Sequence, residues 1–464
     1  MPDASRVTAA IMDLLTSSDR SYPMPEMSTQ DACKRDSKYL THGWGNIPIN
    51  VVRGLGSKFW DCDGKEYIDM LSQTAGVVGI GHCHPKVVAA VKEQADRSFH
   101  ILTSFVNDVR VVFAEKLAAV APGKMKNNCK MYISSGGSEA NEVALKMAML
   151  STGKNEVIST YFSYHGGTLA ELSLLGQSYS RVGPWPRFPG FHQIPNAYCY
   201  RCYFGQPGPD KCNLECAEAL RYAIKYGSAG NVAAFLQEPV PGNGGHMVPP
   251  KRYFKRIREI CDEFGVLYIL DEVQTGVGRS GKWWASEYFD VEPDIFTTSK
   301  AIGGGMPIAA TVIREGLLPE NIIDDQWHIF TFGGSPISCA AGIATIDVIN
   351  EEKLPEKAAR QGERLSKRLN EMMPKYKSIG DVRSMGLFIG VEIVKDKATK
   401  EPWYAGAGNI FGLALGKGAL FGTNGARGNG NIIKLKPPLV LTDEEADKAL
   451  DILEESIAEN EKSL

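Results

Sequence analysis

The 464-residue chain is predicted to adopt an α/β fold, in which helices flank both faces of a mostly parallel sheet. From about residue 85, amphipathic helical patterns alternate with short apolar runs that are typical of buried strands. A hydrophobic content of 43% lets a chain of this length bury a large core, and the length indicates two or three domains rather than one.

The alternation can be assigned along the chain. Helical patterns occupy residues 85–97, 109–121 and 139–152. Strand-like runs occupy residues 130–135, 155–161, 231–239, 266–273 and 294–299. After about residue 336 the chain changes to charged helices, two further strand-like segments and a final acidic helix that opens at Thr442 with an N-capping T-D-E-E pattern.

We therefore expect three segments. Residues 1–75 join a small domain, residues 76–335 form the large domain, and residues 336–464 form the C-terminal part of a small α+β domain.

The charge balance argues against several classes of partner. Lys and Arg number 51 against 54 Asp and Glu, and this net charge of −3 predicts no binding to nucleic acid or to an anionic membrane. No apolar run approaches the roughly 18 residues that span a bilayer. The first forty residues hold only a short apolar patch without a basic stretch before it, so we expect no secretion signal. We expect a small-molecule partner.

The cysteines raise the question of a metal site. Several of the ten lie singly in apolar or glycine-rich segments, which favours a reducing compartment and a cytoplasmic location. Four of them are clustered at spacings that a zinc site could use: Cys199, Cys202, Cys212 and Cys216. Because the second pair is C-x-x-x-C and the linking segment is turn-rich, we expect an insertion loop with free thiols, and a metal or redox role is the alternative.

Two other kinds of motif, a glycine-rich loop and serine-containing turns, are weak evidence for nucleotide binding and for serine-hydrolase activity. GVGRSG at 276–281 resembles a phosphate-binding loop, but Trp283 replaces the Ser or Thr that would hold Mg²⁺. A dinucleotide fingerprint would sit on the first strand of a βαβ unit, whereas several units precede this one. The segments SSGGSEA and FGGSPIS are not G-x-S-x-G elbows, so a serine hydrolase is disfavoured.

Lys300 lies in DIFTTSKAIGGGMP, between an apolar run and a glycine-rich turn, where no helical charge pattern would place it in water. A buried lysine can lose its proton near neutral pH and form a Schiff base with an aldehyde cofactor. Lowering its pKa from about 10.4 to about 7 or 8 disfavours the charged form by roughly 4 kcal/mol.

Three further segments could support such a cofactor. Gly136, Gly137 and Ser138 link a strand to a helix, where free backbone N–H groups can bind a phosphate. Asp271 ends a strand too apolar to leave an acid unpaired, which suits a cationic ring nitrogen. In YHG, either Tyr164 or His165 could stack on a ring.

The ordered set GSEAN, YHG, EPV-x-G, LDEVQTGVGRSG, SK-x-I-G-G-G-x-P and TFGGSP resembles the class III (omega-type) pyridoxal-phosphate-dependent aminotransferases of fold type I, over nearly the whole chain. The resemblance implies that Lys300 holds pyridoxal 5′-phosphate (PLP) and moves a proton, while Asp271 keeps the pyridine nitrogen protonated. Tyr164 would lie on the ring and Gln274 would meet the ring hydroxyl.

The resemblance also implies that Glu238 supports the pocket. It implies that Thr331 reaches the phosphate of a neighbouring subunit, so that a homodimer or a dimer of dimers shares its active sites. The implied reaction moves an amino group from an amine or amino acid to pyruvate or another 2-oxo acid.

The residues that would bind the substrate carboxylate depart from the family pattern. Many members carry an arginine where this chain has Lys434, and a lysine is a point charge rather than a fork. Arg427 matches the mobile arginine of pyruvate-using members. Asn243 replaces the glutamate of ornithine-type members, which disfavours ornithine-like substrates. A decarboxylase of the dialkylglycine type, an amino-acid racemase, a lyase, or a binding protein that has kept only the fold are the alternatives.

Overall fold

The computed structural model describes residues 26–43, 46–177, 182–320, 322, 327–423 and 430–463. The chain forms two compact units, one made of the described part of Met1–Val52 with Trp60–Lys65, the other of Arg53–Phe59 with Glu66–Leu464. The first unit contains helix α2 (Thr29–Tyr39), which begins after Ser28, whose Oγ accepts a hydrogen bond from the Asp31 N–H at 3.1 Å.

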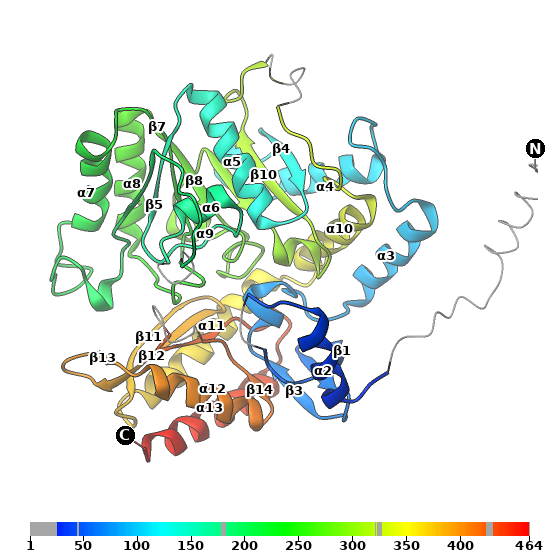
Figure 1. The fold of residues 1–464 in the computed structure, drawn as a ribbon, viewed down its shortest axis with the longest axis vertical. Helices are drawn as coiled ribbons and strands as arrows, with labels where there is room; N and C mark the ends of the chain where they lie inside the picture. Colours follow the sequence, from blue (N-terminus) through cyan, green and yellow to red (C-terminus); the bar gives the residue numbers. More distant parts are fainter. Residues whose placement is uncertain are drawn as a thin grey trace, which may run out of the picture. The chain divides into compact units, whose positions relative to one another are not determined.

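The second unit is organised around a seven-stranded sheet in the order β4-β10-β9-β8-β7-β5-β6 (Figure 1). Its strands are β4 (Cys129–Ser134), β5 (Glu156–Thr160), β6 (Phe191–Ile194), β7 (Val232–Gln237), β8 (Leu267–Asp271), β9 (Ile295–Thr298) and β10 (Ala309–Arg314). Only β10 runs against the other six, so the predicted mostly parallel sheet is confirmed. The sequence patterns predicted five of these strands and missed β6 and β10.

Helices cover the seven-stranded sheet because their apolar faces pack on it. β7 is buried at every position, which explains its continuous apolar run. The helices of this part are α3 (Pro85–Arg97), α4 (Asp108–Ala119), α5 (Gly137–Thr152), α6 (Leu169–Leu174), α7 (Glu215–Tyr222), α8 (Lys251–Phe264), α9 (Ala285–Phe289) and α10 (Pro336–Glu351). The predicted helices at 85–97, 109–121 and 139–152 correspond to α3, α4 and α5.

A smaller sheet follows in the chain, in the order β11-β12-β13, with β15 also paired to β12. Its strands are β11 (Ile379–Met385), β12 (Phe388–Asp396), β13 (Glu401–Pro402) and β15 (Ile432–Leu435). The helices α11 (Leu354–Met372) and α12 (Tyr404–Gly416) pack on it, and α13 (Asp443–Glu461) packs against these two helices. The N-cap predicted at Thr442 is confirmed, since its Oγ1 accepts from the Glu445 N–H and the Glu445 carboxylate accepts from the Thr442 N–H.

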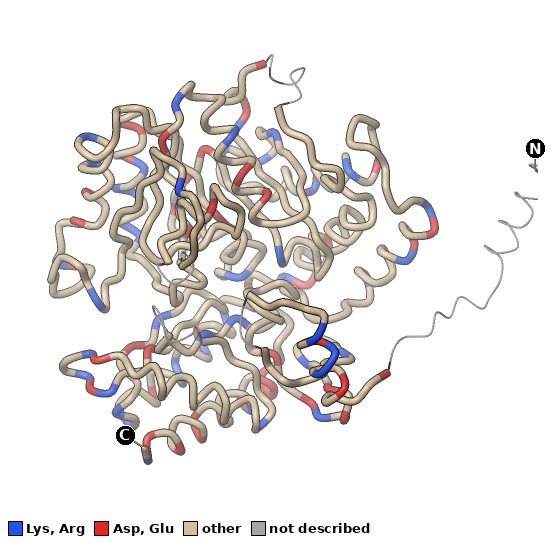
Figure 2. Tube along the Cα trace, in the orientation of Figure 1, with Lys and Arg blue, Asp and Glu red and all other residues tan. Residues whose placement is uncertain are grey.

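The remaining strands are β1 (Val51–Leu55), β2 (Lys58–Asp61), β3 (Glu66–Asp69) and β14 (Ala419–Leu420). β3 pairs with β14 in parallel and thereby joins an early segment to the C-terminal part of the chain. Basic and acidic residues are interspersed along the described chain (Figure 2). Within the described ranges, no helix has the length and hydropathy that crossing a membrane requires.

Candidate active site

The predicted site residues follow the carboxyl ends of parallel strands. Gly136 follows β4, Tyr164 follows β5, Glu238 follows β7, Asp271 ends β8, and Lys300 follows β9. Because these strands run in one direction, their carboxyl ends meet at one edge of the sheet, where ligands bind in open α/β folds. The pairing of Asp271 with Thr297 across β8 and β9 places the aspartate and the segment of Lys300 side by side.

Asp271 is buried, with 3% of its surface exposed, and three groups hold its carboxylate. One oxygen, Oδ1, accepts from the Val273 N–H at 3.0 Å. The other, Oδ2, accepts from the Asn141 side-chain amide at 2.8 Å and lies 2.9 Å from His165 Nδ1. These contacts fix the carboxylate in one orientation, which answers the sequence-based question of what a buried acid pairs with.

Asn141, on α5, connects the aspartate to its surroundings. Its Nδ2 also donates to the His165 carbonyl at 2.7 Å, and its Oδ1 accepts from the Thr297 hydroxyl at 2.8 Å. The residue is 1% exposed. A single amide therefore joins α5, the YHG segment, β8 and β9.

The YHG segment presents two rings in different environments. His165 is 2% exposed, and its Nδ1 faces Asp271 while its Nε2 has no hydrogen-bond partner among the described residues. Tyr164 is half-buried, and its backbone N–H donates to Glu238 at 2.8 Å. Burial, followed by the charges of Glu171 and Glu238, raises the pKa of the Tyr164 phenol. The histidine is therefore committed to the aspartate, and the tyrosine ring is the more accessible of the two.

Glu238 supports this segment from β7. Its carboxylate accepts from the Tyr164 N–H and from the Gly242 N–H at 2.7 Å. Burial and then repulsion from Asp271 raise the pKa of this carboxyl above its ordinary value, against the opposing effects of His165 and the two N–H donors.

The glycine-rich turn before α5 forms an open helix end. Gly136 is the N-cap residue, and its position has no side-chain capping bond. A Cβ on Gly137 would lie 3.1 Å from Val273 Cγ1, so glycine allows this turn to approach the segment after Asp271. The Ser138 hydroxyl accepts from the Gly167 N–H at 3.2 Å. The N–H groups of this helix end suit an anion.

Lys300 has a left-handed backbone, with φ at +53°, at the start of the short 3₁₀ helix η6 (Lys300–Gly303). Burial lowers the pKa of its amine, and the charges of Asp271 and Glu238 oppose that effect. The direction agrees with the sequence-based expectation for an amine nucleophile. A non-glycine residue with positive φ is strained, and such positions are concentrated at functional sites.

Two lysines of the last strand reach the same region. Lys434, on β15, is 4% exposed, and burial lowers its pKa to about 8. Lys436 is 1% exposed and donates to Gln274 Oε1 at 2.8 Å. Burial, and then the charges of Lys434, Lys300 and Arg279, lower the pKa of Lys436 well below its ordinary value.

Two predicted residues are not joined to this group. Thr331 is exposed, and the neighbouring Phe330 N–H donates to the Tyr132 hydroxyl at 3.1 Å. Arg427 lies outside the described residues.

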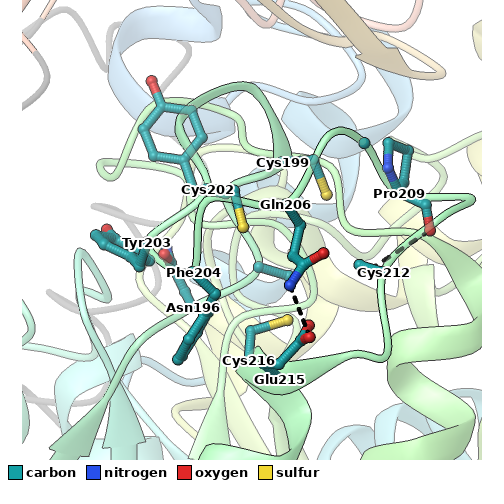
Figure 3. A pocket seen from close by; sticks show the side chains of 13 residues that line it. Asn196, Cys199, Cys202, Tyr203, Phe204, Gln206, Pro209, Cys212, Glu215 and Cys216 are labelled. Carbon is teal, nitrogen blue, oxygen red and sulfur yellow. Dashed lines mark hydrogen bonds between the residues drawn. The ribbon is translucent and has the colours of Figure 1, made fainter.

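Cys199, Cys202 and Cys212 of the segment before α7, which we call the cysteine loop, and Cys216 on α7 line one pocket (Figure 3). Gln206 and Glu215 also line it and form a 2.8 Å hydrogen bond. All four thiols are free, and Cys212 Sγ is 3.0 Å from an Arg252 nitrogen. In the described part of the chain, no group of three or more His, Cys, Asp or Glu side chains is arranged to hold a metal ion.

The same loop is tied to the smaller sheet. The Tyr198 hydroxyl donates to Glu392 on β12 at 2.6 Å, and Arg201 and Arg383 donate to the same carboxylate at 2.5 and 2.8 Å. Burial alone would raise the pKa of Glu392, but Arg383, Tyr198 and Arg201 hold it below its ordinary value.

Sequence reasoning missed Asn141 and Lys436. Asn141 was visible as the last letter of GSEAN, and its place four residues into a helix beside an open N-terminus is the only signal. Lys436 was visible as a second lysine, two residues after Lys434, and the period of two predicts that both face one side of a strand.

The chain is similar in sequence to a known enzyme family. A family model described as aminotransferase class III matches residues 39–457. A leucine/methionine racemase from Thermococcus litoralis is 39% identical over 419 residues, which cover 89% of this chain and 92% of that protein. An acetylornithine aminotransferase from Methanosarcina acetivorans is 36% identical, over 93% of this chain and 98% of that protein.

A solved structure shares the fold. The PLP-bound amine transaminase from an uncultivated Pseudomonas species superimposes with a TM-score of 0.83 at 30% identity, over 96% of this chain and 99% of that one. The fold predicted from the resemblance is therefore confirmed.

Proposed function

The chain belongs to the class III aminotransferases, which depend on PLP, and from this premise we propose which of its residues carry the reaction. Lys300 is the residue that holds the cofactor and moves a proton at the substrate Cα. Asp271 pairs with the cofactor's ring nitrogen. The observation that supports this assignment best is the common sheet edge, where Asp271 and the lysine segment follow neighbouring parallel strands.

The residues present fit PLP. A carboxylate buried to 3% exposure and held by three partners can keep a ring nitrogen protonated, because its charge is fixed and little solvated. The open end of α5 at Gly136, Gly137 and Ser138 suits the phosphate. When bound, PLP supplies an electron sink for the pair left at the substrate Cα.

The other site residues orient the cofactor and exclude water. Tyr164 would stack on the cofactor ring, because His165 is already paired with Asp271. Glu238 holds the Tyr164 backbone in place. Gln274 would offer its amide to the ring hydroxyl of the cofactor. Together these contacts leave the Lys300 amine as the base whose pKa is lowered by burial, which favours its neutral form.

The substrates are an amine or amino acid donor and a 2-oxo acid such as pyruvate. The buried Lys434 provides a positive charge for a substrate carboxylate, and Arg427 is the second candidate. We also propose a cytoplasmic location, because all ten cysteines carry free thiols.

A second copy of this chain completes the site. Several large apolar side chains are exposed on neighbouring segments: Phe99, Leu102, Phe105, Val106, Ile329 and Phe332. The rings of His100 and Phe332 are 5.6 Å apart, so the two segments share one patch, and Thr331 lies in it. Such a patch is typical of a protein interface. Sedimentation of a monomer at micromolar concentration would contradict the dimer.

One experiment tests the reaction. The visible absorption spectrum of the purified enzyme is titrated with amines and amino acids, and then with pyruvate. Donors should convert the cofactor to its amino form, and pyruvate should restore the original spectrum. Lys300→Ala should abolish both changes while its circular dichroism stays that of the parent. Unchanged turnover in Lys300→Ala would refute the assignment.

Racemisation is the second candidate, because the racemase from Thermococcus litoralis is 39% identical to this chain. Chiral chromatography of L-leucine or L-methionine incubated with the enzyme, without a 2-oxo acid, separates the two reactions. Accumulation of the D-enantiomer without release of a 2-oxo acid would favour the racemase.

A further inference from the structure

Lys436 is a buried lysine directly after β15, and nothing in the proposed reaction uses it. Its backbone is fixed on both sides, since its N–H donates to the Met70 carbonyl at 2.8 Å and its carbonyl accepts from the Ser72 hydroxyl at 2.5 Å. The side chain runs past Phe388, with Nζ 5.5 Å from the ring centroid. The lysine is therefore held in one direction.

Its Nζ donates a hydrogen bond to a neutral group, Gln274 Oε1. This is an unusual choice for a buried lysine, which ordinarily pairs with a carboxylate. In this contact Nζ is the donor and the amide oxygen is the acceptor, at 2.8 Å. The contact therefore sets the orientation of the Gln274 amide: Oε1 faces Lys436, and the NH₂ group faces away from it.

Gly242 closes the other side of the same amide. A Cβ at this glycine would lie 2.4 Å from Gln274 Oε1 and 2.6 Å from Nε2, so a side chain at this position would displace the amide. Gly242 is itself anchored through its N–H to Glu238 at 2.7 Å. The amide of Gln274 therefore lies between Lys436 Nζ, which orients it, and the backbone of Gly242, which restricts its rotation.

We propose that Lys436 is a positioning residue that acts through Gln274, fixing its amide so that the NH₂ group is presented to the ring oxygen of the cofactor. This inference rests on the proposed function, in which Gln274 meets that oxygen. The ring oxygen of PLP is an acceptor when it is ionised, and a donor held in place stabilises it without reorganisation. If the amide were free to flip, its oxygen would face that acceptor in part of the population.

A double-mutant cycle on cofactor binding tests the proposal. The dissociation constant of PLP is measured by spectroscopic titration of the apoenzyme for the parent, Lys436→Met, Gln274→Leu and the double variant. Lys436→Met should weaken PLP binding about tenfold, as expected for losing one oriented bond to a charged group. The double variant should bind no more weakly than Gln274→Leu alone, because the lysine acts through the glutamine.

The matched control pairs Lys436→Met with Gln361→Leu, another buried glutamine, whose Nε2 donates to the Leu441 carbonyl at 3.3 Å. That pair should be additive. The pH midpoint of the cofactor's visible band should shift in Lys436→Met and stay unchanged in Gln361→Leu. In the Gln274→Leu background, Lys436→Met should shift the midpoint less than in the parent, because a direct effect of the lysine charge on Lys300 would be equal in both backgrounds.

Additive effects of Lys436→Met and Gln274→Leu, or an unshifted band in Lys436→Met, would overturn the proposal. If Lys436→Met folds poorly, Lys436→Gln, which keeps an N–H donor, should retain most of the parent's PLP affinity, and a loss as large as that of Gln274→Leu would contradict the proposal. A parent enzyme that binds no PLP would instead refute the proposed function, so the two failures are distinguishable.

Discussion

The substitution Asn141→Ala removes the amide that joins four elements around Asp271. It deletes the bond to the Asp271 carboxylate, the bond to the His165 carbonyl and the acceptor of the Thr297 hydroxyl. All of these groups are buried, so water does not replace the lost partner. We expect both stability and the environment of the cofactor to change.

The size of the effect follows from those three bonds. A hydrogen bond to a charged group contributes about 2 kcal/mol and each neutral one about 1 kcal/mol, which gives a loss of about 4 kcal/mol. For 464 residues, an unfolding entropy of about 2.1 cal/mol/K per residue amounts to about 1 kcal/mol/K. The melting temperature should therefore fall by about 4 °C.

Differential scanning calorimetry with and without PLP measures this fall. The control is Asn370→Ala on α11, because the Asn370 side chain is exposed and bonds only within its own helix, to Ser366. It should change the melting temperature by less than about 1 °C, since an exposed substitution usually costs under about 0.5 kcal/mol. If Asn141→Ala lowered the melting temperature no more than Asn370→Ala does, the hydrogen bonds of Asn141 would not stabilise the site as we infer.

Two further predictions concern the phosphate turn and the pH response. Gly166→Ala should weaken PLP binding at least tenfold in a spectroscopic titration, because the new Cβ would lie 2.6 Å from Ser138 Oγ; equal affinity would show that Ser138 does not bind the phosphate. Glu272 is buried, and burial raises its pKa to about 7 despite donors from Thr275, Ala285 and Ser286. Because the folded state then binds the proton more tightly, this group favours folding below about pH 4.5 and loses that contribution as the pH rises through about 7, by up to about 3 kcal/mol. Melting temperatures of Glu272→Gln between pH 5 and 8 should fall less steeply with pH than those of the parent, and parallel curves would contradict the assigned residue.

The strand ends could be predicted from the sequence, and the side-chain partners could not. Lys300 and Asp271 follow apolar runs of the kind that form buried parallel strands, so their common edge follows from the alternation of strands and helices. The partner of Asp271 depends on where α5 packs, 130 residues earlier in the chain. No local pattern encodes that register.

The same limit explains Gln274 and Lys436. They are 162 residues apart, and their contact depends on how the segment after β15 crosses the edge of the large sheet. Gln274 was predicted from the family resemblance. Lys436 was not predicted, because nothing in the sequence around this lysine indicates that its side chain contacts a glutamine. The role proposed for Thr331 depends on a second subunit, which no pattern within one chain describes.

The carboxylate of Glu392 has a consequence for how substrate preference can evolve. It holds Tyr198 and Arg201 of the cysteine loop, and its strand, β12, pairs with β15, which carries Lys434. We therefore expect a change in the length or sequence of that loop to shift Lys434, the residue that we propose for the substrate carboxylate, without altering it. Variants selected for new substrates should therefore accumulate substitutions in the cysteine loop, although this loop is far in the sequence from Lys300 and Lys434.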